Sequence, residues 1–281
     1  MARIFVPWHY YSGSLKYYFL KGRKRYIVNE KGSKFAAHIK RIMAKFGVVV
    51  FPGSNCDHDM LYVMEQILKQ KAVPLWHKET DLQGCEAIIL PGGFSFGDYL
   101  RSGALSKFSP IMNEVIEFSK EGGYVFGICN GFQVLCEAGL LPGALLANTS
   151  RKFSCKNVFL SAENYDTAVT RNIPKGQVLT IPIAHGEGRF YADPAELEKL
   201  NKNGQVLFRY CNAKGEITND ANPNGSIENI AGICNETKNV FGMMPHPERA
   251  SDEVLGNTDG LMILNSLIKA VQKNTLISNR V

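Results

Sequence analysis

The sequence predicts an α/β protein with a mostly parallel sheet, helices on both faces of that sheet and some antiparallel strands in the C-terminal half. Short apolar runs alternate with segments of helical periodicity through the first half of the chain, and this alternation is typical of βαβ units. The 281 residues are enough for one α/β domain with a substantial hydrophobic core. Ligands of such sheets bind beyond the carboxyl ends of the strands, so functional residues are expected in the loops there.

The strands are expected where short apolar runs occur. They cover residues 46–51, 72–76, 87–91, 123–128, 157–162, 178–183, 205–210 and 240–244, and some of the last four are expected to be antiparallel.

Helices are predicted from the spacing of apolar residues. One lies between the first two strands, where Met60 and Met64 share a face and Asp57 is a candidate N-cap. Another covers residues 111–119, and a closing helix covers 258–272.

Residues 1–42 are interpreted as an N-terminal extension of an enzyme domain at 43–281. They hold ten Lys or Arg and one acidic residue, Glu30, so their net charge is +9 and that of the remainder is −3. Met43 opens directly into the first predicted strand, which favours an upstream start-site extension or a disordered tail. A basic segment rich in aromatic residues is also compatible with binding to nucleic acid or a membrane surface, and that alternative stays open.

The composition argues against several classes of protein. The seven cysteines form an odd number without a Cys-x-x-Cys pair, which fits a reducing cytosol better than a disulfide framework or a zinc site. No apolar run reaches the length of a transmembrane helix. Because the domain is mildly acidic, nucleic-acid binding is not expected. We expect a cytoplasmic protein that binds neither nucleic acid nor a membrane.

The most informative segment is Gly127-Ile128-Cys129-Asn130-Gly131-Phe132-Gln133. It joins the apolar run Tyr124-Val125-Phe126 to a helix-like stretch, so Cys129 is expected on a strand-to-helix turn between two glycines that leave room for its backbone. The start of the helix directs N–H groups and a positive dipole at the sulfur, which favours the thiolate that attacks carbonyl groups. A lone cysteine is more often a buried hydrophobic residue, so this interpretation depends on finding a base.

Among the six histidines, His246 is the best candidate for that base. It follows an apolar strand and lies between two prolines, which hold its backbone near an extended geometry. Glu248 follows two residues later and can orient the imidazole ring. Cys129, His246 and Glu248 then supply a nucleophile, a base and an orienting acid.

An acyl-transfer site also needs hydrogen-bond donors for an oxyanion. The buried run 87–91 ends in Pro91-Gly92-Gly93, and the backbone N–H groups of such a loop can approach a ligand closely. Taken alone, the same segment would be a glycine turn after a strand.

These three segments, in this order, resemble the class I (triad) glutamine amidotransferases. Their pattern of Pro-Gly-Gly, then Gly-x-Cys-x-Gly-x-Gln, then His-x-Glu is complete here. Two further segments resemble the branch of the family that works in purine biosynthesis: Pro52-Gly53-Ser54-Asn55-Cys56-Asp57 and Ala184-His185-Gly186-Glu187-Gly188-Arg189-Phe190. The resemblance spans residues 45–272 and implies a flavodoxin-like fold.

The resemblance implies a division of labour between chains. Glutamine would be hydrolysed here to glutamate and ammonia, and the ammonia would pass to a synthetase subunit that converts formylglycinamide ribonucleotide to the amidine. ATP and Mg²⁺ would act on that subunit, which works with a small companion subunit, and neither a cofactor nor a metal is expected in this chain. The absence of any Gly-Lys dipeptide agrees, because a Walker P-loop cannot then be built.

The resemblance also implies roles for further residues. The backbone N–H groups of Gly93 and Asn130 are the expected oxyanion donors, and Gln133 is expected near the substrate. Arg101 is a candidate for the pocket or for the interface with the synthetase. Three other residues keep three open roles, since they could line the glutamine pocket, contact the synthetase or only shape a loop: His185, Glu187 and Arg189.

Three alternative functions remain open at this point. The first is a triad glutaminase that feeds another synthetase, such as one making anthranilate, GMP or CTP, and the two branch-specific segments argue against it. The second is a stand-alone cysteine hydrolase or peptidase, which ammonia release stimulated by a synthetase would exclude. The third is a catalytically inactive binding module, and the intact Cys129, His246 and Glu248 argue against it.

Overall fold

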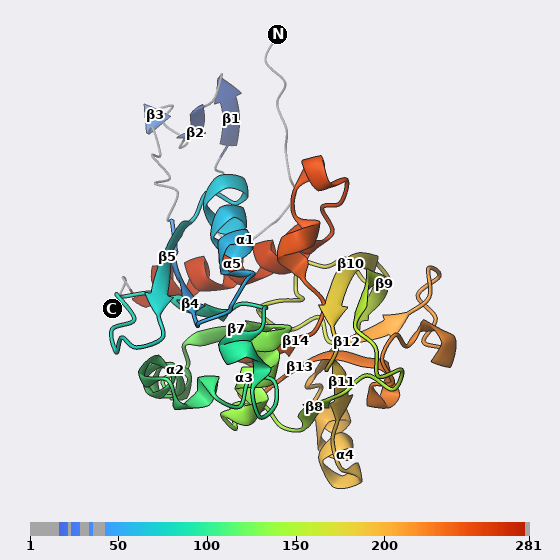
Figure 1. Cartoon of the computed structure of the whole chain (residues 1–281). Coiled ribbons are helices and arrows are strands. Elements are labelled where there is room, and N and C mark those ends of the chain that lie inside the picture. The colour runs from blue at the N-terminus through green and yellow to red at the C-terminus, as the bar shows by residue number, and fades with distance from the viewer. Residues whose placement is uncertain (1–16, 22–23, 29–33, 36–42, 279–281) are drawn as a thin grey trace. The chain divides into compact units, whose positions relative to one another are not determined.

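The computed structural model describes residues 17–21, 24–28, 34–35 and 43–278 (Figure 1). The chain divides into two compact units, Met1–Ile42 and Met43–Val281. In the first unit, β1 (Tyr17–Lys21), β2 (Lys24–Val28) and β3 (Lys34–Phe35) form an antiparallel sheet that the sequence analysis did not predict. The interpretation of residues 1–42 as a start-site extension or disordered tail stays a prediction.

The second unit is built on a nine-stranded mixed sheet, counted over the described residues, in the order β10-β9-β12-β13-β14-β7-β6-β4-β5. Its strands are β4 (Lys45–Val50), β5 (Lys71–Trp76), β6 (Ala87–Leu90), β7 (Tyr124–Ile128), β9 (Ser154–Ala162), β10 (Val178–His185), β12 (Val206–Cys211), β13 (Ile230–Cys234) and β14 (Val240–Met243). The half from β5 to β14 is parallel, and every pairing from β14 to β10 is antiparallel. The predicted α/β class with a mixed sheet is confirmed.

Helices cover both faces of the parallel half, with α1 and α5 on one face and α2 and α3 on the other (Figure 1). The helices are α1 (Asp57–Tyr62), which continues as the π-helix η1 (Val63–Ile67), α2 (Pro110–Lys120), α3 (Asn130–Glu137), α4 (Pro194–Lys202) and α5 (Gly260–Ser278). Short 3₁₀ turns are η2 (Ser95–Asp98), η3 (Ser106–Phe108), η4 (Asn219–Ala221), η5 (Ile227–Asn229), η6 (Pro247–Ala250) and η7 (Glu253–Leu255). The strands β8 (Ala144–Leu146) and β11 (Arg189–Tyr191) pair separately.

The sequence analysis missed some of these elements and misplaced one cap. It did not predict α4, β8, β11 or β13. The N-cap of α1 is Cys56, which makes no side-chain capping bond, and Asp57 is already the first helical residue. Asp57 as a cap candidate was therefore wrong.

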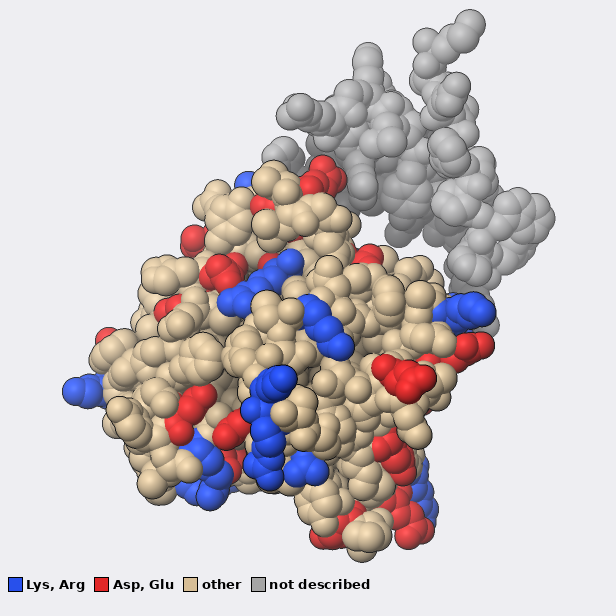
Figure 2. Space-filling view, turned by 45° about the vertical axis from the view of Figure 1, so that its right-hand side comes forward, with Lys and Arg blue, Asp and Glu red and all other residues tan. Residues whose placement is uncertain are grey.

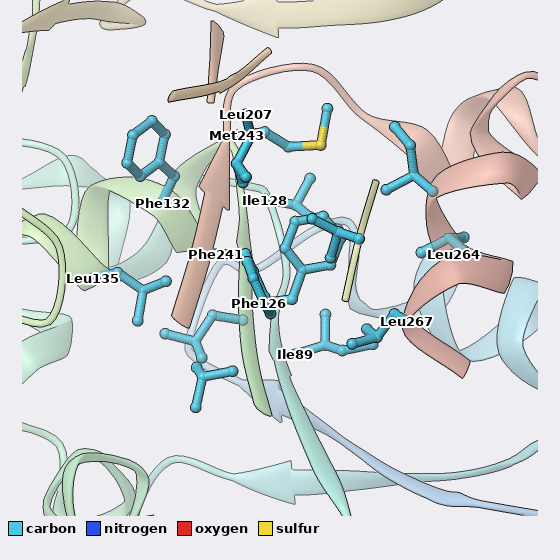
Figure 3. Close-up of a cluster of buried hydrophobic side chains, with 14 of the residues drawn as sticks. Ile89, Phe126, Ile128, Phe132, Leu135, Leu207, Phe241, Met243, Leu264 and Leu267 are labelled. Carbon is cyan, nitrogen blue, oxygen red and sulfur yellow. The ribbon is translucent and has the colours of Figure 1, made fainter. Parts of the chain in front are cut away.

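The core lies between α3 and α5, with the central strands between them (Figure 3). Phe132 and Leu135 pack against the sheet from the α3 side, and Leu264 and Leu267 pack from the α5 side (Figure 3). All four side chains are buried. Gly242 lets α3 lie close to the sheet, because a Cβ at this position would lie only 2.2 Å from the Phe132 ring. The N-cap of α3 is Cys129.

The surface of the second unit carries charges of both signs. On the face in Figure 2, basic and acidic side chains are interspersed. Among the described helices, none combines the length and the apolar character needed to cross a bilayer.

Candidate active site

Cys129 lies on the sharp turn between β7 and α3. Its backbone angles, φ of 51° and ψ of −106°, fall in a region that residues other than glycine rarely adopt. A Cβ at Gly127 would lie 2.6 Å from the carbonyl oxygen of Gly131, and a Cβ at Gly131 would lie 1.9 Å from that of Leu90. Both glycines are therefore required by close backbone contacts. The turn holds the cysteine at the carboxyl end of β7, as the sequence predicted.

His246 and Glu248 reach the same edge of the sheet from β14. This strand pairs in parallel with β7, and Met243 lies beside Ile128 in the register. The Nδ1 atom of His246 lies 2.6 Å from Oε1 of Glu248, and both side chains are buried. The backbone N–H of His246 also donates to the carbonyl of Pro182 at 2.8 Å. The histidine is thus held by its ring and by its backbone.

Gly92 brings the three loops together. A Cβ at this position would lie 2.7 Å from Cε1 of His246 and 3.4 Å from Cβ of Cys129. The absence of a side chain therefore lets the Pro91-Gly92-Gly93 loop lie directly against both residues.

The ionisation of His246 is set by its neighbours. Burial lowers the pKa of His246, but the nearby Glu248 carboxylate and the Cys129 sulfur together raise that pKa well above its ordinary value. The Nε2 atom has no hydrogen-bond partner among the described residues. An imidazole with an unbonded Nε2 beside a thiol can accept the proton of that thiol, and the Glu248 carboxylate stabilises the charged ring that results.

The two expected oxyanion donors are both free. Neither the backbone N–H of Gly93 nor that of Asn130 donates to another residue in the described part of the chain. Asn130 is the first residue of α3, where backbone N–H groups have no partner within the helix. The structure therefore offers two unbonded donors next to Cys129, and their catalytic role remains a prediction.

The side chain of Gln133 connects α3 to neighbouring loops. Its Oε1 accepts from Nδ2 of Asn130 at 2.9 Å, and its Nε2 donates to the carbonyl of Glu187 at 2.5 Å. The Asn130 amide also donates to Asp98 at 3.2 Å. Gln133 thus fixes the loop beside the triad, and its expected proximity to the substrate stays a prediction.

His185 is buried, and its ring contacts other residues than the ring of His246 does. Its Nδ1 lies 3.1 Å from Oδ1 of Asn148, and a Cβ at Gly188 would lie 2.3 Å from the ring. Burial and the neighbouring His246 lower the pKa of His185 to about 4. His185 is therefore neutral at pH 7.

The other open residues make contacts that stabilise loops. Glu187 accepts from Oγ of Ser102 at 2.8 Å, and Arg189 donates to the carbonyl of Ala147 at 3.1 Å. Arg101 makes a two-point ion pair with Glu137, at the end of α3, and its side chain is 63% exposed. The structure does not bring the Arg101 guanidinium to the triad.

Sequence reasoning missed two residues beside the triad. Nη2 of Arg249 lies 3.0 Å from Sγ of Cys56. The Cys56 sulfur also lies 3.1 Å from where a Cβ of Gly92 would be. The available signals were the Pro-Gly-Ser-Asn-Cys-Asp segment, which resembled the family but had no assigned role, and the position of Arg249 directly after Glu248.

Two residues of the triad and Cys56 together have the spacing of a metal site. Cys56, His246 and Glu248 offer ligand atoms that all lie within 4.8 Å of one another. A cation there would compete with the Arg249 guanidinium, which already donates to the Cys56 sulfur. Glu248 is likewise bonded to the His246 ring. We therefore interpret Cys56, His246 and Glu248 as a group held together by hydrogen bonds within the protein and not as a set of metal ligands.

The fold and the site together define a class I glutamine amidotransferase. Residues 43–261 match the family of CobB/CobQ-like glutamine amidotransferase domains. The chain is 56% identical over 229 residues to phosphoribosylformylglycinamidine synthase subunit PurQ of Koribacter versatilis, a match to 82% of this chain and 99% of that protein. It is 58% identical over 221 residues to PurQ of Chlorobaculum parvum, covering 79% of this chain and 88% of that protein.

A solved structure gives the same result. One chain in the structure of PurLQS from Thermotoga maritima is 42% identical, with a TM-score of 0.73, and the match covers 82% of this chain and 100% of that one. The chain therefore belongs to the PurQ family of glutamine amidotransferases. The alternatives of a glutaminase from another synthetase and of a stand-alone hydrolase lose their support.

Proposed function

We propose that this chain is the glutaminase subunit of a phosphoribosylformylglycinamidine synthase and supplies ammonia for purine biosynthesis. The observation that carries the proposal is the strained Cys129 turn beside the buried His246–Glu248 pair. The similarity to PurQ subunits along nearly their whole length supports the same activity.

The first half of the reaction forms a thioester. In the reactive state His246 holds the proton that Cys129 has given up, and the Cys129 sulfur attacks the side-chain carbonyl carbon of glutamine. The carbonyl oxygen becomes an oxyanion that the N–H groups of Gly93 and Asn130 stabilise. When the intermediate collapses, the C–N bond breaks and His246 protonates the departing ammonia.

The second half releases glutamate. His246, neutral again, accepts a proton from a water molecule that attacks the thioester carbonyl. The same donors hold the second oxyanion, and the C–S bond breaks as Cys129 leaves. Glu248 keeps the imidazole oriented and stabilises its charged form in both halves, as its 2.6 Å contact with Nδ1 allows.

The ammonia is delivered to a synthetase partner. The relative in PurLQS of Thermotoga maritima belongs to such an assembly, and we propose the same set of a PurL synthetase subunit and a small PurS subunit here. ATP and Mg²⁺ act on the synthetase, where formylglycinamide ribonucleotide becomes the amidine, and this chain uses no cofactor of its own. We place the reaction in the cytoplasm, because the cysteine pattern fits a reducing compartment.

The test uses the assembled enzyme with Cys129→Ala. We expect glutamine-dependent synthesis to be abolished and ammonia-dependent synthesis to be retained, because only the ammonia source resides in this chain. Cys155→Ala, which removes an exposed thiol on β9, is the matched control and keeps both activities. Glutamine-dependent turnover near wild type in Cys129→Ala would show that Cys129 is not the nucleophile.

A second measurement tests the coupling to partners. Steady-state ammonia release from glutamine is expected to be low for the isolated chain and to rise sharply with the synthetase, the small subunit, nucleotide and ribonucleotide substrate. The Gly92-Gly93 loop is the expected moving part, because a glycine peptide that is released from its neighbouring contacts rotates between donor orientations at low cost. Equal kcat/KM for glutamine in all conditions would instead favour a stand-alone hydrolase.

A further inference from the structure

The Pro52-Gly53-Ser54-Asn55-Cys56-Asp57 segment has no part in the chemistry described above, yet it lies directly against the oxyanion loop. Backbone hydrogen bonds join the two segments: Cys56 N–H donates to Gly92 O at 3.3 Å, Phe94 N–H to Gly53 O at 2.8 Å and Phe96 N–H to Pro52 O at 2.6 Å. The oxyanion loop is therefore fixed by a neighbouring turn as well as by its own strand.

Gly93 shows how closely the two segments pack. Its φ of +131° is a conformation that favours glycine, and a Cβ there would lie 2.4 Å from the backbone nitrogen of Asn55. The position of the loop and the position of the turn thus depend on each other.

The bond from Cys56 to Gly92 sets the direction of the predicted oxyanion donor. The carbonyl of Gly92 and the N–H of Gly93 belong to one trans peptide, so they point in opposite directions. While the Cys56 N–H holds the Gly92 carbonyl, the Gly93 N–H is directed away from the turn. Rotation of this peptide by half a turn would exchange the two groups and break the bond.

Arg249 connects this turn to the loop that carries His246 and Glu248. Its Nη2 donates to Sγ of Cys56 at 3.0 Å and its Nε to Asp59 at 3.2 Å. Its backbone N–H donates to the carbonyl of His246 at 3.2 Å. Cys56 is only 3% exposed, so its sulfur has little freedom to take another position. Arg249 therefore links the two segments, with its backbone bonded to His246 and its side chain bonded to the turn that carries Cys56.

We propose that Cys56 and Arg249 are positioning residues, which hold the Gly92–Gly93 peptide in the orientation that presents the Gly93 N–H to the oxyanion. The contact between the Arg249 guanidinium and the Cys56 sulfur seats residue 56, and its N–H then fixes the peptide. This inference rests on the proposed glutaminase activity and assigns a purpose to the Pro-Gly-Ser-Asn-Cys-Asp segment.

The experiment compares three properties of Arg249→Gln, Cys56→Ala and Cys56→Ser in the full chain assembled with its partner subunits. The first is kcat and KM for glutamine. The second is inhibition by glutamate γ-semialdehyde, whose hemithioacetal with Cys129 carries the oxyanion. The third is the alkylation rate of Cys129 by iodoacetamide, which needs no oxyanion donor.

We expect Arg249→Gln to lower kcat about 10- to 100-fold with KM within about twofold, less than the loss from deleting an oxyanion donor outright. The inhibition constant of the aldehyde should rise by a similar factor, while the alkylation rate changes less than about threefold. Cys56→Ala should behave alike, and Cys56→Ser should recover most of the loss because its hydroxyl still accepts a hydrogen bond.

Two variants control for charge and for cavity formation. Arg171→Gln removes an arginine that pairs with the exposed Asp166, and Cys234→Ala removes a buried thiol on β13. Both are expected to keep wild-type kcat. If Cys56→Ala does not fold, Arg249→Gln and Cys56→Ser still decide the matter.

Several results would overturn the inference. They are an unchanged kcat in Arg249→Gln, a change in KM alone, or an alkylation rate that falls in step with kcat, since the last would place the effect on the thiol and its base. A wild-type complex that does not hydrolyse glutamine would refute the proposed function instead. A complex that hydrolyses glutamine equally well with all these variants would refute only the positioning role.

Discussion

Two segments at this edge of the sheet each bury a histidine, and the two rings differ in the partner that each one meets. In the loop after β14, Nδ1 of His246 meets a carboxylate oxygen of Glu248 at 2.6 Å. At the end of β10, Nδ1 of His185 meets an amide oxygen of Asn148 at 3.1 Å. In both rings, Nε2 has no partner among the residues that the structure describes.

The oxygen partner decides the charge of each ring. A carboxylate favours the protonated imidazole, so the pKa of His246 is raised despite its burial. The amide of Asn148 carries no charge, so burial and the nearby His246 lower the pKa of His185 to about 4. Of these two buried histidines, His246 is the candidate base because a carboxylate compensates for its desolvation.

The largest loss of activity is expected when His246 is replaced. We predict that His246→Ala lowers glutaminase kcat about 10³-fold or more, nearly as much as Cys129→Ala, because the thiol loses its base. The double variant should be no worse than the poorer single variant, since residues that act as one unit give non-additive losses. Steady-state rates of the three variants check this, and losses that multiply independently would contradict the triad.

Glu248→Gln tests the effect of the partner directly, because it gives His246 an uncharged amide partner like the one that His185 has in Asn148. We predict a milder loss in kcat, about 10- to 100-fold, since an orienting acid usually matters less than the base. The pKa of His246 should fall, because the compensating carboxylate is gone. Rates and pH profiles of the variant in the assembled enzyme measure both effects. A variant with wild-type kcat would remove Glu248 from the mechanism.

His185 is predicted to affect stability in acid more than catalysis. Its pKa of about 4 in the folded chain lies below its ordinary value of 6.5, so the unfolded chain binds more protons between these values. The free energy of unfolding therefore falls by about 3 kcal/mol as the pH falls from 6.5 to 4, at about 1.4 kcal/mol per pKa unit. His246, whose folded pKa is raised, adds no change in this window, because its contribution is lost only as the pH rises above 6.5.

Urea unfolding of wild type and His185→Gln at several pH values tests this. The variant is expected to lose less stability on acidification than wild type, and its kcat at pH 7.5 is expected to fall much less than that of His246→Ala. Parallel stability curves for the two proteins would show that His185 is not the buried neutral group.

The smallest effect is expected from removing residues 1–42, which include neither His246 nor His185. The family match begins at residue 43, and β4, the first strand of the large sheet, begins at Lys45. We predict that the chain starting at Met43 keeps the melting temperature and the partner-stimulated glutaminase activity of the full chain. A loss of several degrees, or of complex formation, would show that this segment is part of the working protein.

The features that sequence could predict are those encoded by local pattern. The Cys129 turn needed glycines at 127 and 131, and both clash distances show why no larger residue would fit. The helix α4 also had a local signal that was not used, since Asp193 precedes a proline at the first helical turn and accepts from the N–H of Glu196. A closer reading of helix starts would have found it.

Other features depend on contacts between distant parts of the chain. The strand β13 is a five-residue apolar run whose place in the sheet is set by its partners β12 and β14. The pairing of Arg249 with Cys56 joins positions 193 residues apart. Likewise, only the fold shows that Asn148 faces His185. No local pattern carries these contacts.

We infer that a carboxylate makes His246 the charged partner of Cys129, while an amide leaves His185 neutral. An imidazole ¹H–¹⁵N NMR titration of the labelled full chain, assigned with His246→Ala and His185→Gln, follows both rings in one sample. We predict that the His246 resonances report a protonated ring at pH 7 that titrates well above pH 6.5, while His185 stays neutral down to about pH 4. Two rings titrating together near pH 6.5, or a neutral His246 beside a charged His185, would contradict the account.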